Sequence, residues 1–297
     1  MQRRSRRVVL LLLLLLLLGA GAAWKAGIFG GGTAAKEDRE ASKPAQPEGT
    51  AAPAPPPERP EETPSLAPTL TVEIADGVVM EFVLAPAGSF RMGSEAGDAD
   101  EKPVVDVTLA AFYVGRHEVT QAQWAALMPD NPSAHKDPRN PVESVTWDEC
   151  VAFLATARAP EGWRFALPSE AQWEYACRAG TTTAYHFGDD PAALSAHGWH
   201  KGNADGRPHA VGTGRPNAWG LYDVHGNVWE WCADGWHDSH RGAPGDGSVR
   251  AGGRGRVLRG GSWVHPPEEA RAASRPWCPP TARNSYRGFG AVLVSAP

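Results

Sequence analysis

The stretch from Gly220 to Trp236, GLYDVHGNVWEWCADGW, brings carboxylates and large aromatic rings together in one short segment. Carboxylate oxygens are ligands for hard cations such as calcium, and indole rings beside them can form the wall of a binding pocket. The same pattern fits a tryptophan-rich core strand whose acidic side chains face water. From the residues alone, both interpretations stay open. The acids are Asp223, Glu230 and Asp234, and the tryptophans are Trp229, Trp231 and Trp236.

Histidines and cysteines elsewhere give weaker metal signals. His237 and His240 have a spacing that a metal could use. They lie in a Gly-rich loop without a helix to align them, so a solvated pair is expected. The cysteines form no CxxC pair and no dense disulfide framework, although one or two bridges are compatible with an exported chain. These cysteines are Cys150, Cys177, Cys232 and Cys278.

The composition favours a fold rich in loops and argues against nucleic acid as a partner. The chain of 297 residues contains 33 Gly, 27 Pro and 12 Trp, which favours loops held by aromatic anchors over long helices. Its formal net charge is -5 and its basic residues are scattered. A protein that binds a polyanion is expected to show a basic stripe instead, so no nucleic-acid partner is expected.

The first 29 residues are expected to export the chain and anchor it to a membrane. Four arginines in residues 1–7 precede an apolar, leucine-rich run from Val8 to Trp24. The run is short for a spanning helix of about 20 residues and long for a cleaved signal core of about 7 to 15. An uncleaved signal anchor is favoured, with the remainder in the periplasm or at the cell surface. Cleavage as a signal peptide, which would give a secreted protein, is the alternative.

Two further segments follow the anchor. Residues 30–69 are rich in Pro, Ala and Glu, and they predict a disordered tether because such a segment cannot bury enough apolar surface to fold. Residues 70–297 predict one irregular α+β domain that must position the side chains described above. No period of 20 to 50 residues repeats, so a solenoid or propeller is not expected.

Local signals place a hairpin, three short helices and a few brief strands in this domain. Alternating strands on either side of Asp76-Gly77 predict the hairpin. Helices are predicted to start at Thr120, Thr146 and Ser169, the last two with capping boxes. Gly180 is expected to end the third helix in a left-handed conformation. Later strand signals are residues 228–232, 257–263 and 288–294.

Seven ordered motifs resemble the formylglycine-generating enzyme family, also known as the sulfatase-modifying factors. The resemblance implies a C-type-lectin-like fold with little regular secondary structure that is braced by calcium. This agrees with the loop-rich composition. The motifs run in order across nearly all of residues 79–295, and they are APAGSFRMGS, FYVGRHEVTQAQW, PVESVTWDECVAF, ALPSEAQWEYACRAG, GLYDVHGNVWEW, RVLRGGSW and RGFGAVLV.

The resemblance further implies two calcium sites. Mixed carbonyl and carboxylate oxygens beside the GNxWEW loop suit a hard cation. A second site would use Asn203 and Ala204, whereas the residues alone also fit an Asn-Ala-Asp-Gly turn that caps itself. The ligands implied for the first site are Asp223, Gly226, Val228 and Glu230.

The chain departs from the family at the residues that carry its chemistry. Family enzymes use two cysteines after the GGS motif to bind copper(I) as thiolates and activate oxygen. Here the segment reads GGSWVHPPEEARAASR, with His265 at the first cysteine position and Ala270 at the second. Copper(I) favours thiolate ligands, so copper is not expected.

Three residues remain candidates for catalysis. The resemblance implies that Trp229 faces the pocket while Trp231 faces the core, and that Ser262 lines the pocket without acting as a catalytic serine. His265 could bind a metal or act as an acid or base, or it could be an ordinary loop histidine. Nearby arginines could hold the carboxylates of a ligand or pair with acids of the same domain. They are Arg259, Arg271, Arg275 and Arg283.

The expected function is therefore that of an exported relative of the family that is not a copper oxidase. It would bind a peptide, protein or glycan ligand in the family's cleft. The alternative is a divergent oxidase that acts on a protein cysteine or a small molecule through ligands other than cysteine. Whether the chain is an enzyme stays open at this point.

Overall fold

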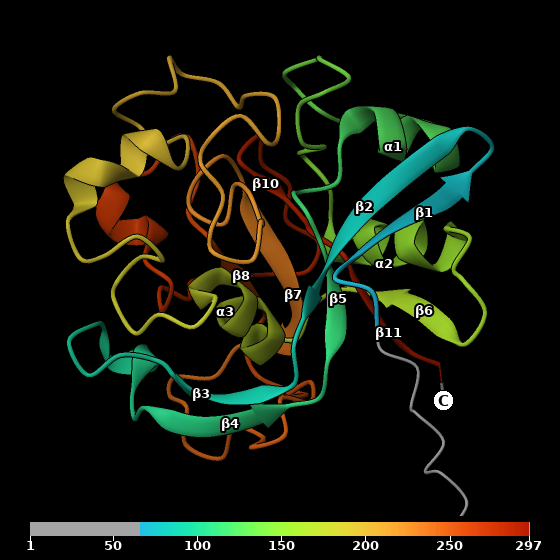
Figure 1. The fold of residues 1–297 in the computed structure, drawn as a ribbon. Helices are drawn as coiled ribbons and strands as arrows, with labels where there is room; N and C mark the ends of the chain where they lie inside the picture. Colours follow the sequence, from blue (N-terminus) through green and yellow to red (C-terminus); the bar gives the residue numbers. More distant parts are fainter. Residues whose placement is uncertain (1–65, 297) are drawn as a thin grey trace, which may run out of the picture. The chain divides into compact units, whose positions relative to one another are not determined.

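A five-stranded antiparallel sheet is the largest sheet in the computed structural model, which describes residues 66–296 (Figure 1). The predicted anchor and nearly all of the predicted tether lie outside these residues. The described helices are all too short or too polar to cross a lipid bilayer. The strand order is β1 (Thr69–Ala75), β2 (Val78–Ala85), β5 (Phe112–Gly115), β11 (Val292–Ser295) and β6 (Trp163–Ala166).

The first two strands form the predicted hairpin, and the last strand enters the sheet between two strands from the middle of the chain. Gly77 lies at φ 73° in the hairpin turn, a conformation that glycine adopts without steric cost. Leu293 of β11 is opposite Tyr113 of β5 on one side and Phe165 of β6 on the other. The sheet is therefore built from the beginning, middle and end of the described chain.

Three α-helices start where the sequence predicts. They are α1 (Gln121–Leu127), α2 (Trp147–Thr156) and α3 (Glu170–Arg178), and each begins with a complete capping box. The end of α3 differs from the prediction by one residue, since Ala179 is the left-handed cap at φ 45° and Gly180 follows it at φ 93°. Three short 3-10 helices cover Ala99–Glu101, Pro191–Ala196 and Pro267–Ala270.

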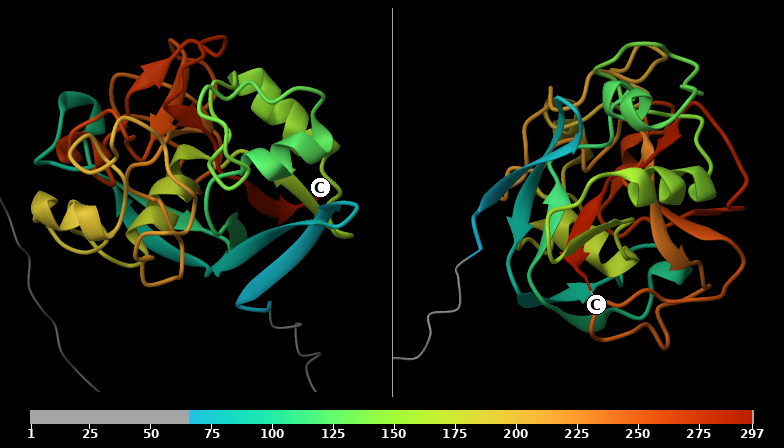
Figure 2. Two further views of the ribbon diagram at one scale, coloured as in Figure 1. Left: turned by 90° about the horizontal axis from the view of Figure 1, so that it is seen from above. Right: turned by 90° about the vertical axis from the view of Figure 1, so that its right-hand side faces the viewer.

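The helices pack on different sheets. Helix α1 contacts β2 and α2 contacts β6, so both lie beside the five-stranded sheet, as the views of Figure 2 also show. Helix α3 contacts β7 and β8 of a second sheet instead. This four-stranded sheet has the order β10 (Arg287–Gly288), β7 (Trp229–Gly235), β8 (Arg256–Arg259) and β9 (Trp277–Cys278). A two-stranded sheet pairs β3 (Gly88–Met92) with β4 (Val105–Leu109).

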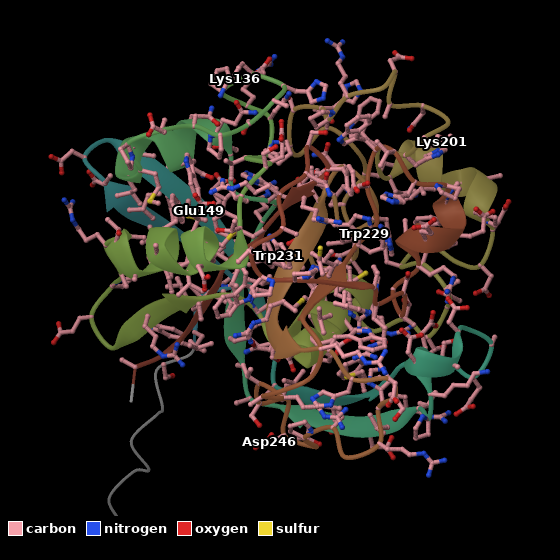
Figure 3. The ribbon with its side chains drawn as sticks, turned by 180° about the vertical axis from the view of Figure 1, so that it is seen from behind. Lys136, Glu149, Lys201, Trp229, Trp231 and Asp246 are labelled. Carbon is pink, nitrogen blue, oxygen red and sulfur yellow. The ribbon has the colours of Figure 1, made fainter. Side chains whose placement is uncertain are left out.

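The core is dominated by aromatic rings, as the composition suggests. Trp124 stacks on Phe153 with ring centroids 5.4 Å apart, and the edge of Phe289 meets both rings. Trp229 and Trp231 of β7 belong to the same buried cluster and lie in the middle of the molecule (Figure 3). Burial of such large rings compensates for the small amount of regular secondary structure.

A buried network of ion pairs holds α3 to the second sheet. Arg259 of β8 is fully buried and lies 2.7 Å from Glu174 and 3.1 Å from Glu170 of α3. Arg275 contacts Glu170 at 2.6 Å. Burial by itself raises the pKa of Glu170, but the two arginines outweigh this effect and lower it to about 2.

The remaining predicted arginines also pair with acids of the domain. Arg271 lies 2.7 Å from Glu101, and Arg283 lies 2.6 Å from Glu149. The four arginines of the pocket segment are therefore engaged in pairs within the fold.

The prediction of a solvated histidine pair is wrong for His240. Its residue is 1% exposed, because the loop after β7 folds it against the buried ion network. His237 stays partly exposed and its Nε2 lies 3.1 Å from the carbonyl oxygen of Ala251. The four cysteines, all within the described part, are buried and free.

Candidate functional site

The loop that precedes β7 is held in a strained but well-supported conformation. Asp223, Gly226 and Asn227 all have positive φ, at 56°, 99° and 54°. A Cβ at Gly226 would lie 2.2 Å from the carbonyl oxygen of Trp199, so no larger residue fits there. The loop is tied to its surroundings by hydrogen bonds from Gly226 N to Gly260 O and from Asn227 N to Trp199 O. Such conformations favour Asp, Asn and Gly.

The two carboxylates predicted to bind calcium are both buried beside this loop. Asp223 is 1% exposed and Glu230 is 8% exposed. One oxygen of Asp223 accepts a hydrogen bond from Gly212 N at 2.6 Å, while the other finds no partner within residues 66–296. Burial raises the pKa of Asp223 to about 6. Burial, and then the negative charge of Asp223, raise the pKa of Glu230 to about 7.

A third buried acid, Glu118, completes this group and was not singled out from the sequence. Its oxygens accept hydrogen bonds from Asn227 Nδ2 at 3.1 Å and from Val228 N at 3.3 Å. Burial, and then the charges of Asp223 and Glu230, raise its pKa well above the usual value. The position of Glu118 in the HEVT motif, far from the loop in sequence, hides its role from any local pattern.

This arrangement fits a bound divalent cation. The orphaned oxygen of Asp223 and the mutual repulsion of three buried carboxylates would both be relieved by a positive charge. In the described part of the chain, however, no three His, Cys, Asp or Glu side chains converge as ligands by themselves. A calcium ion here would therefore need the carbonyl oxygens of Gly226 and Val228 as well.

The residues of the second predicted calcium site already have hydrogen-bond partners in this structure. Asn203 Oδ1 accepts a hydrogen bond from His200 N at 2.7 Å, and its Nδ2 donates to Gly198 O at 3.0 Å. The carbonyl oxygen of Ala204 lies 2.9 Å from His209 Nε2. These contacts close the turn on itself, and calcium at this turn stays a prediction.

The three predicted catalytic candidates do lie together. Trp229 Nε1 donates to His265 Nδ1 at 3.1 Å, and Ser262 Oγ lies 2.6 Å from the same nitrogen. Trp229 and Ser262 are only 2% and 1% exposed, so they form the wall behind His265 and do not line an open pocket. His265 is the accessible member of the group, with 24% of its side chain exposed.

The surroundings of His265 fix which nitrogen carries its proton. An indole N–H can only donate, so Nδ1 must accept and the neutral ring must carry its hydrogen on Nε2. This nitrogen points toward Glu269, whose carboxylate oxygen lies 3.7 Å away. Partial burial lowers the pKa of His265, Glu269 opposes the shift and Arg287 adds to it. The imidazole of His265 is therefore a neutral hydrogen-bond donor near neutral pH.

The position of the second family cysteine, Ala270, is buried. Ala270 is 1% exposed and ends the 3-10 helix Pro267–Ala270. Its carbonyl oxygen lies 2.7 Å from Nδ1 of His225, and Nε2 of His225 accepts a hydrogen bond from His186 N at 3.1 Å. His225 therefore satisfies backbone groups of other loops and not of its own turn.

The sequence of this chain is similar to one protein family and to several of its members. A family model described as "Sulfatase-modifying factor enzyme 1-like domain" matches residues 71–294. A formylglycine-generating enzyme from Thermomonospora curvata is 31% identical over 297 residues, which covers 73% of this chain and 93% of that protein. The chaperone protein LppX from Paenibacillus barcinonensis is 28% identical over 237 residues, which covers 62% of this chain and 79% of that protein.

Two solved structures share the fold. PvdO from Pseudomonas aeruginosa is 30% identical, with a TM-score of 0.69 over 77% of this chain and 99% of that one. Treponema denticola variable protein 1 is 27% identical, with a TM-score of 0.70 over 76% of this chain and 99% of that one. The predicted irregular α+β fold is confirmed by these likenesses and by the elements described above.

Proposed function

The chain belongs to the sulfatase-modifying factor enzyme 1-like domain family, and we propose from its altered site that it is a ligand-binding member and not a copper oxidase. The ligand would be a peptide, a protein or a glycan that contacts His265 and its neighbours. The proposal keeps residues 1–29 as a membrane anchor and residues 30–69 as a tether. The binding domain would then act outside the cytoplasm.

One observation carries the proposal: His265 Nδ1 faces two hydrogen-bonding groups, Trp229 Nε1 and Ser262 Oγ. To bind a metal through Nε2, the ring would have to move its proton to Nδ1, where it would meet the indole N–H. To bind a metal through Nδ1, it would have to displace both partners. His265 therefore occupies the position of the first family cysteine, but its hydrogen bonds prevent it from binding a metal as that cysteine does. This disfavours a divergent oxidase that uses His265 as its metal ligand.

The second cysteine position supports the same proposal. Ala270 offers no donor atom in its side chain, and it is packed against Gly261, where a Cβ would lie 2.6 Å from the Cβ of Ala270. Cys278 is placed elsewhere, in β9, where it pairs with Arg256 of β8. The similarity to a protein named as a chaperone is compatible with a role in assisting another protein, although it does not identify one.

We also propose a structural calcium ion at the first predicted site. Asp223 and Glu230 would supply carboxylate oxygens, and Gly226 and Val228 would supply carbonyl oxygens. The ion would neutralise buried charge beside β7 and thereby stabilise the wall behind His265.

Copper binding tests whether the chain is a copper oxidase. A variant with both family cysteines restored provides the positive control. The wild-type chain and the double variant His265→Cys with Ala270→Cys are each titrated with copper(I) against a competing chelator. Each protein is then incubated with oxygen and a CxPxR peptide, and aldehyde is measured by mass spectrometry. We expect no stoichiometric copper site and no aldehyde for the wild type, and tight copper binding only for the double variant.

Tight copper binding by the wild type, together with conversion of the peptide, would refute the proposal. Oxygen consumption by the wild type with iron or copper that is lost in His265→Ala would instead support the divergent oxidase. If the double variant does not fold, the formylglycine-generating enzyme from Thermomonospora curvata, which is similar to this chain, serves as the positive control in the same assay.

A further inference from the structure

A polar cavity of 470 Å³ lies between the loop that follows α1 and the loop of residues 199–213. Its volume is in the range of about 300–1,000 Å³ that is typical of sites for small ligands. We call it the basic pocket: three cationic side chains and a pair of stacked rings line it. They are Lys136, Arg139, Arg207, Trp199 and His209. Figure 3 shows Lys136 at the outer surface of the first loop.

Hydrogen bonds join the walls of the basic pocket to each other and to the rest of the domain. Val211 N donates to Arg139 O at 3.0 Å, and Asn140 Nδ2 donates to Pro208 O at 3.4 Å, so the two loops are joined directly. His209 N donates to Asn227 Oδ1 at 3.0 Å, which ties the pocket to the loop before β7. A preformed site of this kind loses less conformational entropy when a ligand binds.

The charge of the basic pocket is opposite to that of the whole chain. Lys136, Arg139 and Arg207 are exposed at its rim, and its lining contains one carboxylate, Asp137. Asp137 lies 3.7 Å from Arg139 Nε, while Lys136 Nζ donates to the neutral carbonyl of Asn131. The rim thus keeps an excess of positive charge in a chain whose formal net charge is -5. Guanidinium groups arranged in this way favour carboxylate or sulfate groups.

Two aromatic rings, stacked face to face, line the basic pocket beside the cations. Trp199 and His209 stack with ring centroids 3.7 Å apart and an angle of 13° between their planes. Trp199 Nε1 donates to Thr213 Oγ1 at 3.0 Å and His209 Nε2 lies 2.9 Å from Ala204 O, so both rings are fixed. The C–H face of a sugar ring can pack on such a surface while its charged substituent reaches the rim.

The basic pocket also adjoins the site around His265. The ring of His135, which lines the pocket, meets the edge of Trp263 with centroids 5.4 Å apart, and Trp263 follows Ser262 in the chain. Lys201 N, from the second loop, donates to His265 O at 2.9 Å. One extended ligand could therefore contact both places.

We propose that the basic pocket binds an acidic saccharide, with a carboxylate or sulfate at Arg139 and Arg207 and a sugar ring on the outer side of the stack of Trp199 and His209. This inference rests on the proposed binding function and names the class of its ligand. A short acidic peptide would match the charge, but it would leave the stacked rings without a partner. The lining of the pocket contains no strand, so it also offers no strand edge on which an extended peptide could pair.

Isothermal titration calorimetry of the full chain, purified in a polyoxyethylene detergent that carries no sugar, tests this inference. The probes are trigalacturonate, a hyaluronan tetrasaccharide and a chondroitin sulfate disaccharide, with the methyl ester of trigalacturonate as the neutral counterpart. We expect saturable binding of at least one acidic probe, at least tenfold tighter than its uncharged counterpart and weaker at high salt. Arg207→Gln should weaken it at least tenfold, and Arg91→Gln, an exposed arginine on β3, should leave it unchanged.

Several results would overturn the inference. One is that no acidic probe binds at millimolar concentration, and another is that the methyl ester of trigalacturonate binds as tightly as trigalacturonate itself. Triglutamate and adenosine monophosphate serve as acidic compounds without an acidic sugar, and the inference fails if either binds as tightly as the acidic saccharides. It also fails if Arg207→Gln does not affect the binding. Because Arg207 is exposed, its substitution does not threaten folding. Acidic saccharide binding that survives Arg207→Gln but is lost in His265→Ala would move the ligand to the neighbouring site. In that case the inference fails while the proposed function stands.

Discussion

His240 shows how a single buried residue makes the stability of this fold depend on pH. Its Nε2 atom has no hydrogen-bond partner among the described residues. Burial, and then the positive charges of Arg275 and Arg259, lower its pKa to about 4, although Glu170 and Glu174 oppose the shift. An unfolded chain takes up this proton near pH 6.5. The contribution of His240 to stability is therefore fully present above pH 6.5 and is lost as the pH drops toward 4.

The variant His240→Leu isolates this contribution. The loss between pH 6.5 and 4 can reach about 3 kcal/mol in the free energy of unfolding for the wild type, and the variant should lack it. Urea unfolding at several pH values measures the difference between the two proteins. Asp234 acts in the opposite direction, because burial raises its pKa to about 7, but it is common to both proteins and cancels. The control is His237→Leu in the same loop. Parallel curves for wild type and His240→Leu would contradict the prediction.

For single residues, the sequence predicts which side chains belong to a site better than it predicts their burial and contacts. The acids of the loop before β7 could be singled out because Asp223 and Glu230 lie in one motif. Glu118 could not, since only the folded chain brings it to Asn227. His240 was wrongly expected in solvent because its Gly-rich surroundings resemble a surface loop, and the ion network that buries it comes from three distant elements.

Among the secondary-structure elements, helix α3 begins at a residue whose hydroxyl group makes two hydrogen bonds. Ser169 Oγ accepts from Gln172 N at 3.1 Å as a helix cap and also donates to the carbonyl oxygen of Gly247 at 2.7 Å. Ser169→Ala should cost about 2 kcal/mol, because a cap contributes about 1 kcal/mol and the orphaned buried carbonyl adds a similar amount. Thr120→Val at the start of α1, which keeps the buried methyl group and loses only the capping hydroxyl, should cost about 1 kcal/mol. Urea unfolding measures both, and equal costs would show that the contact with Gly247 contributes nothing.

The starts of the helices could be predicted because capping is local. Thr120, Thr146 and Ser169 each have their partner three residues ahead, so the pattern is complete within one turn. The end of α3 was misplaced by one residue because Ala179 adopts a left-handed conformation that alanine rarely takes. Contacts of the folded chain override that preference.

For the whole molecule, the proposed calcium ion should make stability depend on calcium concentration. A ligand present at 100 times its dissociation constant adds about 2.7 kcal/mol, which corresponds to a rise in Tm of roughly 5–10 °C for a domain of this size. Differential scanning calorimetry with calcium, with magnesium and with a chelator measures this shift. We expect the shift with calcium only.

The variant Asp223→Asn provides the matched test. It keeps an oxygen for Gly212 N but removes one buried charge, so it should lose the calcium response without being less stable than the metal-free wild type. Asp246→Asn, on an exposed turn, is the control and should respond as the wild type does. A Tm of the wild type that does not change with calcium would exclude the ion. A normal response in Asp223→Asn would place it elsewhere.

The family motifs predict the overall fold well and the state of the site poorly. They fix the order of the elements, and the identities at 265 and 270 already separate this chain from the copper enzymes. They do not show how His265 is held, because its partner Trp229 comes from β7, 36 residues earlier in the chain. The basic pocket likewise arises from two loops that no motif covers.

The place of β11 has a consequence for the order in which the domain folds. Residues 292–295 are the last strand to be synthesised, yet they lie inside the five-stranded sheet between β5 and β6. The sheet cannot close until residues 292–295 have left the ribosome, and the pairing of Tyr113 with Leu293 joins residues that are 180 positions apart (293 − 113). Contacts of such long range slow folding. A domain assembled in this order keeps one edge of β5 without its partner strand until residues 292–295 have been made, and an unpaired strand edge can pair with a second chain.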